Sequence, residues 1–269
     1  MQDDAALRLQ MQDAWNQAAQ GYLAYWSPRF EPYLRRAVEA FRPAPLGPLA
    51  VEGCGPGDEV LLIARKFPGR TIMATDLSPA MVDLARRRVR EAGLESVLVA
   101  EDQAGEVAGR IRQAGGVFSS FVLQLLPNPM AVVADWSRAL RRDGSITVLF
   151  WPRHTGSSAF SRLQRILEKF EDERAHWEEP VLEALYRLGL RVSLDELVAF
   201  DMEHGSPEEC WQQLLESGPL RAVERRLGKD RLAEAAQDWL RDHGFERKGD
   251  AWVHRPEARL WVLERSARG

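Results

Sequence analysis

The stretch Leu49-Ala-Val-Glu-Gly-Cys-Gly-Pro-Gly-Asp-Glu59 decides the fold expected for this chain. Its first four residues predict a short buried strand, and its last residues begin a helix that ends at Phe67, before Pro68. Glycine has no Cβ and accepts strained dihedral angles, so a glycine-rich turn lets the backbone pass close to a ligand. Open parallel α/β sheets bind ligands at such turns, beyond the carboxyl ends of their strands.

The two acids that end this stretch indicate which ligand to expect. Asp58 and Glu59 at the start of a helix suit the helix dipole, but two carboxylates there are expected to repel a pyrophosphate. A cationic ligand without phosphate meets no such repulsion, and S-adenosylmethionine (SAM) is one, through its sulfonium and amino groups. The alternative is a tight turn with helix-capping acids and no ligand.

A second predicted strand, residues 71–76, ends in Asp76 about twenty residues after the glycine turn, the spacing that lets a carboxylate accept both ribose hydroxyls. No arginine follows Asp76 closely, so a 2′-phosphate has no evident partner. Ser78 and Pro79 then read as the N-cap and first residue of a helix. A third strand, residues 96–100, precedes Asp102.

These features together resemble the class I SAM-dependent methyltransferases, and within them the group that methylates small molecules, similar to the quinone-biosynthesis methyltransferases. The resemblance rests on five segments in order, residues 53–57, 74–81, 101–104, 119–129 and 138–146. It is close over residues 49–151 and loose elsewhere. It implies methyl transfer from SAM to a small-molecule acceptor.

The resemblance also implies a set of cofactor contacts. The implied cofactor-binding residues are Gly53, Cys54, Gly55, Gly57, Asp76, Leu77, Met81, Asp102 and Gln103. The glycines would lie along the methionine part of SAM and Asp76 would hold the ribose. Leu77 and Met81 would pack on the adenine, Asp102 would accept from its amino group, and the backbone of Gln103 would meet the ring.

One position departs from the family pattern. Relatives usually carry an acid two residues before the first glycine, where this chain has Val51; its acid is Glu52. Side chains alternate along a strand, so Glu52 is expected to point away from where the usual acid points. Three groups are then candidates for the contact with the SAM amino group: Glu52 in another orientation, a water molecule, or Glu59.

Five further residues are candidates for the acceptor side. Tyr22 and Trp26 belong to N-terminal helices that lie across the cofactor site in the family, or else they anchor those helices in the core. Gln124 faces the acceptor or satisfies a local backbone group. Trp151 lies where the fifth strand leaves the carboxyl edge, and His154 is the candidate general base, since histidine titrates near neutral pH. The alternative for His154 is a histidine in a surface loop.

The fold class expected is α/β, with a seven-stranded, mostly parallel sheet, helices on both faces, an N-terminal helical cover and a C-terminal helical lid. The domain boundaries predicted are 1–45 for the cover, 46–154 for the SAM-binding core, and 155–269 for the rest of the sheet with the lid inserted at 206–244. Ser27-Pro28 is expected to separate two N-terminal helices, and residues 192–203 to form the sixth strand. Lid helices are predicted at 207–215, 219–227 and 230–242, where apolar residues recur at helical spacing.

Composition narrows the function further. The formal net charge of −4 gives no global attraction to nucleic acid or to an anionic membrane. The run Arg86-Arg-Arg88 reads as a solvated helix face, because acids surround it. The fourth strand lacks the Asn/Asp-Pro-Pro-aromatic ending of enzymes that methylate amide nitrogens. We therefore expect no nucleic-acid substrate.

Cys54 and Cys210 suggest a reducing compartment and no metal cluster. No signal peptide and no membrane-length apolar run is evident, so a cytoplasmic location and no membrane partner are expected. Two other functions stay open: a SAM-binding regulatory or scaffold protein without methyl transfer, and a nicotinamide-dependent oxidoreductase.

Overall fold

The computed structural model describes residues 2–153, 156–169 and 177–265. The chain divides into two compact units, each assembled from three stretches of sequence. The helical unit combines residues 1–30, 152–175 and 198–258, and the sheet unit combines residues 31–151, 176–197 and 259–269. The sequence-based boundaries at 45 and 154 stay a prediction.

The sheet unit is built on seven strands in the order β3-β2-β1-β4-β5-β10-β6. Their bounds are Leu49–Glu52 (β1), Ile72–Asp76 (β2), Val97–Glu101 (β3), Ala114–Ser120 (β4), Leu140–Phe150 (β5), Leu190–Ala199 (β6) and Glu257–Arg265 (β10). The first five strands pair in parallel, and β10 pairs antiparallel with β5. The predicted seven-stranded, mostly parallel sheet is confirmed. Strand order reverses between β1 and β4, which is where such sheets bind ligands.

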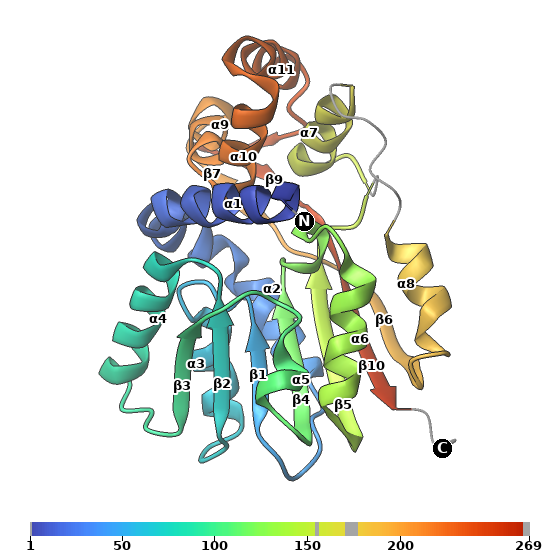
Figure 1. The fold of residues 1–269 in the computed structure, drawn as a ribbon. Coiled ribbons are helices and arrows are strands. Elements are labelled where there is room, and N and C mark those ends of the chain that lie inside the picture. Colours follow the sequence, from blue (N-terminus) through green and yellow to red (C-terminus); the bar gives the residue numbers. More distant parts are fainter. Residues whose placement is uncertain (1, 154–155, 170–176, 266–269) are drawn as a thin grey trace. The chain divides into compact units, whose positions relative to one another are not determined.

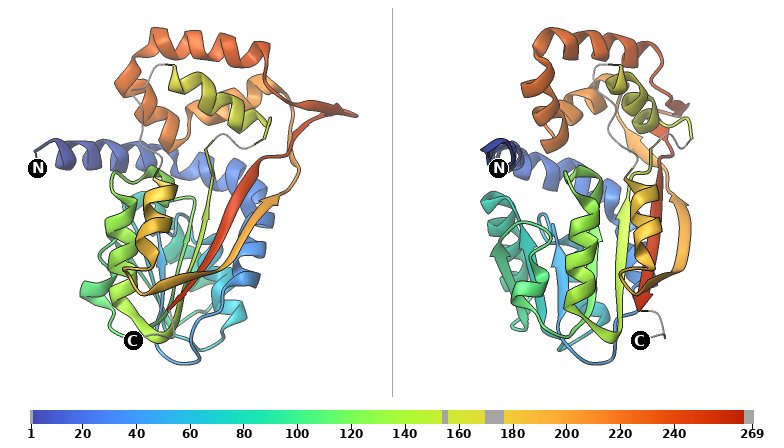
Figure 2. Two further views of the ribbon diagram at one scale, coloured as in Figure 1. Left: turned by 90° about the vertical axis from the view of Figure 1, so that its right-hand side faces the viewer. Right: turned by 45° about the vertical axis from the view of Figure 1, so that its right-hand side comes forward.

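Helices cover both faces of this sheet, as predicted. They are α2 (Ser27–Ala40), α3 (Asp58–Lys66), α4 (Pro79–Glu91), α5 (Val107–Arg110), the short 3₁₀ helix Leu123–Leu125, α6 (Pro129–Ala139) and α8 (Glu178–Leu185). In Figure 1, α6 lies in front of the sheet and α3 behind it. Trp136 of α6, Phe150 of β5 and Trp261 of β10 are fully buried in the core on the α6 side. Figure 2 shows β6 alongside β10 at the edge of the sheet.

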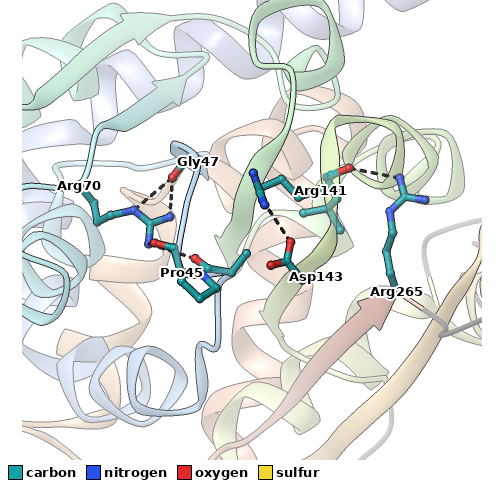
Figure 3. Close-up of polar contacts among 8 residues, drawn as sticks. Pro45, Gly47, Arg70, Arg141, Asp143 and Arg265 are labelled. Carbon is teal, nitrogen blue, oxygen red and sulfur yellow. Dashed lines mark hydrogen bonds and ion pairs between the residues drawn. The ribbon is translucent and has the colours of Figure 1, made fainter.

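Arginines fasten the connections at the amino ends of the strands (Figure 3). Arg70 donates to the carbonyl oxygens of Pro45 (3.1 Å) and Gly47, just before β1. Arg265 donates to the carbonyl oxygen of Leu140 at 3.4 Å, and Arg141 pairs with Asp143 at 3.1 Å. Guanidinium groups held this way act as structural donors to the backbone.

The helical unit contains α1 (Gln2–Gly21), a π-helix (Tyr22–Trp26), α7 (Ala159–Glu168), α9 (Pro207–Leu215), α10 (Gly218–Leu227) and α11 (Lys229–Arg241). The last three are the helices predicted between residues 207 and 242. A small sheet, in the order β7-β9-β8, was not predicted; its strands are Met202–His204, Ala251–His254 and Glu246–Lys248. The single sixth strand predicted at 192–203 is therefore wrong, because the chain leaves β6 at Ala199 and pairs with β9 from Met202.

The predicted break at Ser27-Pro28 is also wrong. The helix continues through a π turn, in which the Ser27 N–H donates to the Tyr22 carbonyl, directly into α2. Proline lacks an N–H and crowds the preceding turn. The wider π turn accommodates the missing N–H and the bulk of the proline ring, so Pro28 lies inside the first turn of α2 without ending the helix. Within the described part of the chain, no helix is both long and apolar enough to cross a membrane.

Candidate cofactor site

The glycine turn after β1 is held in a conformation that favours glycine. Gly53, Gly55 and Gly57 have φ values of +67°, +48° and +91°. A Cβ on Gly53 would lie 2.2 Å from Cγ2 of Val122, so that glycine packs against the chain itself. A Cβ on Gly55 would meet nothing within 4 Å. The turn is therefore closed by protein at Gly53 and open at Gly55, where a ligand has room to approach the backbone.

Asp76, at the end of β2, lies against this open side of the turn. Its Oδ2 accepts from the Gly55 N–H and its Oδ1 from the Ser78 N–H, both at 2.8 Å. A carboxylate oxygen has two lone pairs, so each oxygen keeps one acceptor site free of these two backbone bonds. Two free acceptor directions on one carboxylate match the two hydroxyls of a ribose. Burial raises the pKa of Asp76 to about 6.

Asp102 and Gln103 lie at the next strand end. The Asp102 N–H donates to the Asp76 carbonyl at 2.9 Å, which places the two predicted acids on neighbouring strands. The Asp102 carboxylate accepts from the Gln103 N–H at 2.8 Å and pairs with Arg110. The structure thus brings Gly55, Asp76 and Asp102 together, as the sequence predicted. The contacts of Asp102 and Gln103 with adenine stay a prediction.

The remaining predicted cofactor residues are packed into the protein. Cys54 is completely buried, and burial raises the pKa of its thiol well above the ordinary value. Met81 is 2% exposed in the first turns of α4, while Leu77 is half-buried. Ser78 caps α4 as predicted, with its Oγ accepting from the Met81 N–H. The contacts of Leu77 and Met81 with adenine stay predictions.

Glu52 and Glu59 are the two acids considered for the contact with the SAM amino group, because Val51 carries no carboxylate. The Glu52 carboxylate is buried and accepts from Thr75 Oγ1 (2.8 Å) and the Gly105 N–H (3.0 Å), so both its oxygens serve the fold. Glu59 lies in the first turn of α3, is 4% exposed, and accepts from Ser120 Oγ at 2.7 Å. Burial raises the pKa of Glu59 to about 8. Of the two acids, Glu59 is the one left for a cationic group beside the turn.

Asp58 is not the free carboxylate that the sequence suggested. Arg88 of α4 pairs with Asp58 at 2.7 Å and donates to the Pro56 carbonyl at 2.9 Å. Arg88 therefore fixes the glycine turn to α4, and the prediction that the whole arginine run is a solvated helix face is wrong for this residue. Because Asp58 is paired with Arg88, it contributes less repulsion toward a pyrophosphate than an unpaired carboxylate would. No local pattern signals this pair, because the helix packing brings it together.

Sequence reasoning missed an aromatic group at the ends of β4 and β5. Phe121 follows β4 with a φ of +58°, and its ring stacks on Trp151 with centroids 4.5 Å apart. Tyr33 meets Trp151 edge-on at 5.3 Å. A bulky residue at positive φ is strained, and such strain clusters at functional sites. The predicted residue Trp151 thus belongs to a rigid aromatic wall on the sheet unit.

The other predicted acceptor residues have local partners. Gln124 donates from Nε2 to the Phe121 carbonyl at 2.9 Å, and its buried Oε1 has no hydrogen-bond partner among the described residues. In the helical unit, Trp26 is 3% exposed and stacks on Phe30 at 5.6 Å, as a core anchor would. Tyr22 contacts Phe30 at 5.8 Å. His154 lies outside the described residues, so its role stays a prediction.

Comparison with known proteins agrees with this geometry. Residues 52–144, which run from the glycine turn to the start of β5, match the model of a methyltransferase domain. Residues 52–144 thus form a methyltransferase domain of the class I SAM-dependent kind. The predicted family and the SAM cofactor are confirmed, and the nicotinamide-dependent alternative is not supported.

Three related proteins are informative. Nocamycin O-methyltransferase of Saccharothrix syringae is 31% identical over 44% of this chain and 42% of its own, so the chain spans under half of that relative. Trans-aconitate 2-methyltransferase of Mycobacterium sp. strain KMS is 23% identical over 94% of this chain and 99% of its own. The structure of geranyl diphosphate C-methyltransferase from Streptomyces coelicolor, solved with S-adenosylhomocysteine, superimposes with a TM-score of 0.51 at 17% identity, covering 88% of this chain and 80% of that one. This last likeness concerns the fold.

Proposed function

We propose that the chain transfers the methyl group of SAM to an oxygen atom of a small molecule that carries a carboxylate or hydroxyl group. The observation that carries this proposal is the open face of Gly55 beside the Asp76 carboxylate. The choice of an oxygen acceptor is supported by the similarity to nocamycin O-methyltransferase, and the choice of an acid by the similarity to trans-aconitate 2-methyltransferase.

The residues present fit SAM in three respects. Gly55 leaves space for the methionine part, the Asp76 oxygens have acceptor sites for the ribose, and the buried Glu59 offers a carboxyl group to a cation. When bound, SAM supplies an electrophilic methyl group on a sulfonium. The chain's own contribution is to fix the reacting groups in line and exclude water. The partly exposed stacked rings of Phe121 and Trp151, backed by the buried Tyr33, support an acceptor with apolar surface.

An acid acceptor would make a general base unnecessary. A carboxylic acid with a pKa of ~4 is already deprotonated at neutral pH, so its oxygen is a ready nucleophile. A hydroxyl acceptor would need a base, and His154 is the proposed one. Replacing His154 by Gln therefore separates the two acceptor classes: transfer to a carboxylate stays within about twofold, while transfer to a hydroxyl falls by ~10²-fold or more.

We propose further that the protein acts in the cytoplasm and takes no nucleic-acid substrate. Cys54 and Cys210 are both free and buried, which suits a reducing compartment. The net charge of −4 disfavours a polyanion. Titration with tRNA and with duplex DNA at rising salt tests the second point; tight binding that weakens steeply with salt would overturn it.

The test of methyl transfer is a label assay. Purified protein is given methyl-labelled SAM and a panel of small carboxylic acids and hydroxyl compounds, and label in the acceptor is measured. Transfer that is lost in Gly55→Ala and retained in Gly93→Ala would support the proposal, because both glycines have positive φ and only Gly55 faces the proposed cofactor. Saturable SAM binding without transfer to any compound of a broad panel would favour a regulatory SAM-binding protein instead.

A further inference from the structure

Two histidines share one face of the small sheet in the helical unit. In the antiparallel pair of β7 and β9, Met202 lies opposite His254 and His204 lies opposite Trp252. Side chains two residues apart on a strand point to the same face, so His204 and His254 are diagonal neighbours across the two strands. Their ring centroids are 5.1 Å apart.

Aromatic side chains enclose this pair. Phe245 contacts both rings, with centroids 5.3 Å from His204 and 4.8 Å from His254, and Phe160 lies 4.8 Å from His254. Only 2% of His204 and 3% of His254 is exposed. The hydroxyl of Tyr25 is 2.7 Å from Nδ1 of His204. The imidazoles are therefore removed from bulk water, and within the described part of the chain one hydrogen bond joins them to the protein.

Three ring nitrogens in this enclosure have no protein partner. Nε2 of His204 and both Nδ1 and Nε2 of His254 are buried and make no hydrogen bond to any described residue. Leaving a buried polar atom unsatisfied is costly, and buried polar groups in folded proteins nearly always have a partner. Three such atoms on two neighbouring rings indicate that a group outside the protein completes at least one nitrogen of each ring.

The charges nearby favour an anion over a cation. Burial, helped by the guanidinium of Arg29, lowers the pKa of His204 to about 3, and burial, His204 and Arg29 lower that of His254 to about 2. Arg29 is the charged group that acts on both rings; its guanidinium lies 3.6 Å from the centre of the Tyr25 ring. Among the described residues, no carboxylate is hydrogen-bonded to either imidazole, since Nδ1 of His204 meets Tyr25 and the other three ring nitrogens have no partner. The described residues also offer no group of three or more His, Cys, Asp or Glu side chains for a metal ion.

We propose that His204 and His254 bind the carboxylate group of a small molecule. In the proposed arrangement the hydrogen bond between the Tyr25 hydroxyl and Nδ1 of His204 has the phenol as its donor, so that the proton of the neutral imidazole is on Nε2. His254 contributes the N–H of its own neutral ring. Each N–H donates to one carboxylate oxygen, and the field of Arg29 stabilises the negative charge. The proposal uses residues of the helical unit alone and does not depend on the proposed methyl transfer.

The test observes the imidazole resonances by NMR in the full-length protein with acetate as the probe. Saturable shifts of the His204 and His254 signals are expected with acetate and not with acetamide, which has the same shape without the charge. His243, whose Nδ1 already accepts from the Phe245 N–H, is the internal control and should not shift. Equal shifts with both probes would mean a neutral polar site, and no shift with either would mean that water alone satisfies the pair; both results overturn the proposal.

A second variant keeps the test independent of folding. His254→Phe replaces the ring by one of similar shape without unpaired nitrogens, so the melting temperature is expected to rise by a few degrees while the acetate response of His204 disappears. His243→Gln, changed outside the pair, should leave the acetate response intact. An acetate response of His204 that survives His254→Phe would show that the two rings do not act together, and would refute the paired site.

Discussion

The glycine turn allows one prediction to be worked out from three matched substitutions. Gly53, Gly55 and Gly93 have φ values of +67°, +48° and +67°, so alanine at each position carries similar backbone strain. They differ in what the new methyl group meets. At Gly93 it meets nothing within 4 Å, at Gly53 it lies 2.2 Å from Cγ2 of Val122, and at Gly55 it enters the open space where we place the cofactor.

The magnitudes follow from these environments. A left-handed alanine costs about 1 kcal/mol, so Gly93→Ala and Gly55→Ala should lower the free energy of unfolding by that amount each. Gly53→Ala adds overpacking of ~1 to 3 kcal/mol against Val122, for a total loss of ~2 to 4 kcal/mol. Cofactor affinity should change differently. Gly55→Ala should weaken it by ~10-fold or more, which corresponds to ~1.4 kcal/mol, while Gly93→Ala leaves it unchanged.

Two measurements separate stability from binding. Equilibrium unfolding in urea gives the stability of each variant, and calorimetric titration with S-adenosylhomocysteine gives its affinity. The decisive comparison is Gly55→Ala with Gly93→Ala, since these two should be equally stable and differ only in affinity. If Gly55→Ala bound the ligand as tightly as Gly93→Ala, the open side of the turn would not be the cofactor site, and the reasoning would fail.

Three further predictions concern single side chains. Asp76→Ala should cost ~1 to 3 kcal/mol of cofactor affinity by calorimetry, and Asp102→Ala less, because the Gln103 backbone still meets the adenine; the reverse order would contradict the ribose role. Since the raised pKa of Glu59 keeps it neutral below about pH 8, the affinity for SAM should rise more steeply between pH 7 and 9 in the native protein than in Glu59→Gln; an identical slope in the variant would exclude Glu59 as the acid that senses the cation. At Phe121, with φ at +58°, the Gly variant should be more stable than the Ala variant by about 1 kcal/mol in urea unfolding, the opposite of the usual order, and the usual order would argue against a left-handed residue there.

Ionisation of Glu59, which should strengthen SAM binding, should lower the free energy of unfolding. Its folded pKa of about 8 lies above the ordinary value near 4.5, so the folded state holds a proton that the unfolded state has lost between these pH values. The contribution of Glu59 to stability therefore falls as pH rises from ~4.5 to ~8. The ionised form of Glu59 thus favours cofactor binding, whereas its protonated form favours folding.

The sequence alone determined the mostly parallel sheet, the glycine turn and the strand-end positions of the predicted cofactor residues Asp76 and Asp102. These features obey local rules: apolar runs form buried strands, glycines occupy left-handed positions, and Ser78 caps a helix with its own side chain. Strands that end at one edge of a parallel sheet bring their last residues together. Asp76 and Asp102 could therefore be predicted as neighbours from their positions at the ends of two successive strands.

Only the tertiary structure decided which of these groups are charged, free or strained. Arg88 reaches Asp58 because α4 packs beside the turn, and Glu59 is buried against Ser120 because β4 lies next to β1. The left-handed Phe121 and the diagonal pair His204 and His254 depend on strand ends and strand register that no short sequence pattern encodes. Such contacts join residues far apart in the chain, so their geometry is fixed by packing and pairing, whereas the rules that can be read from sequence act over a few residues.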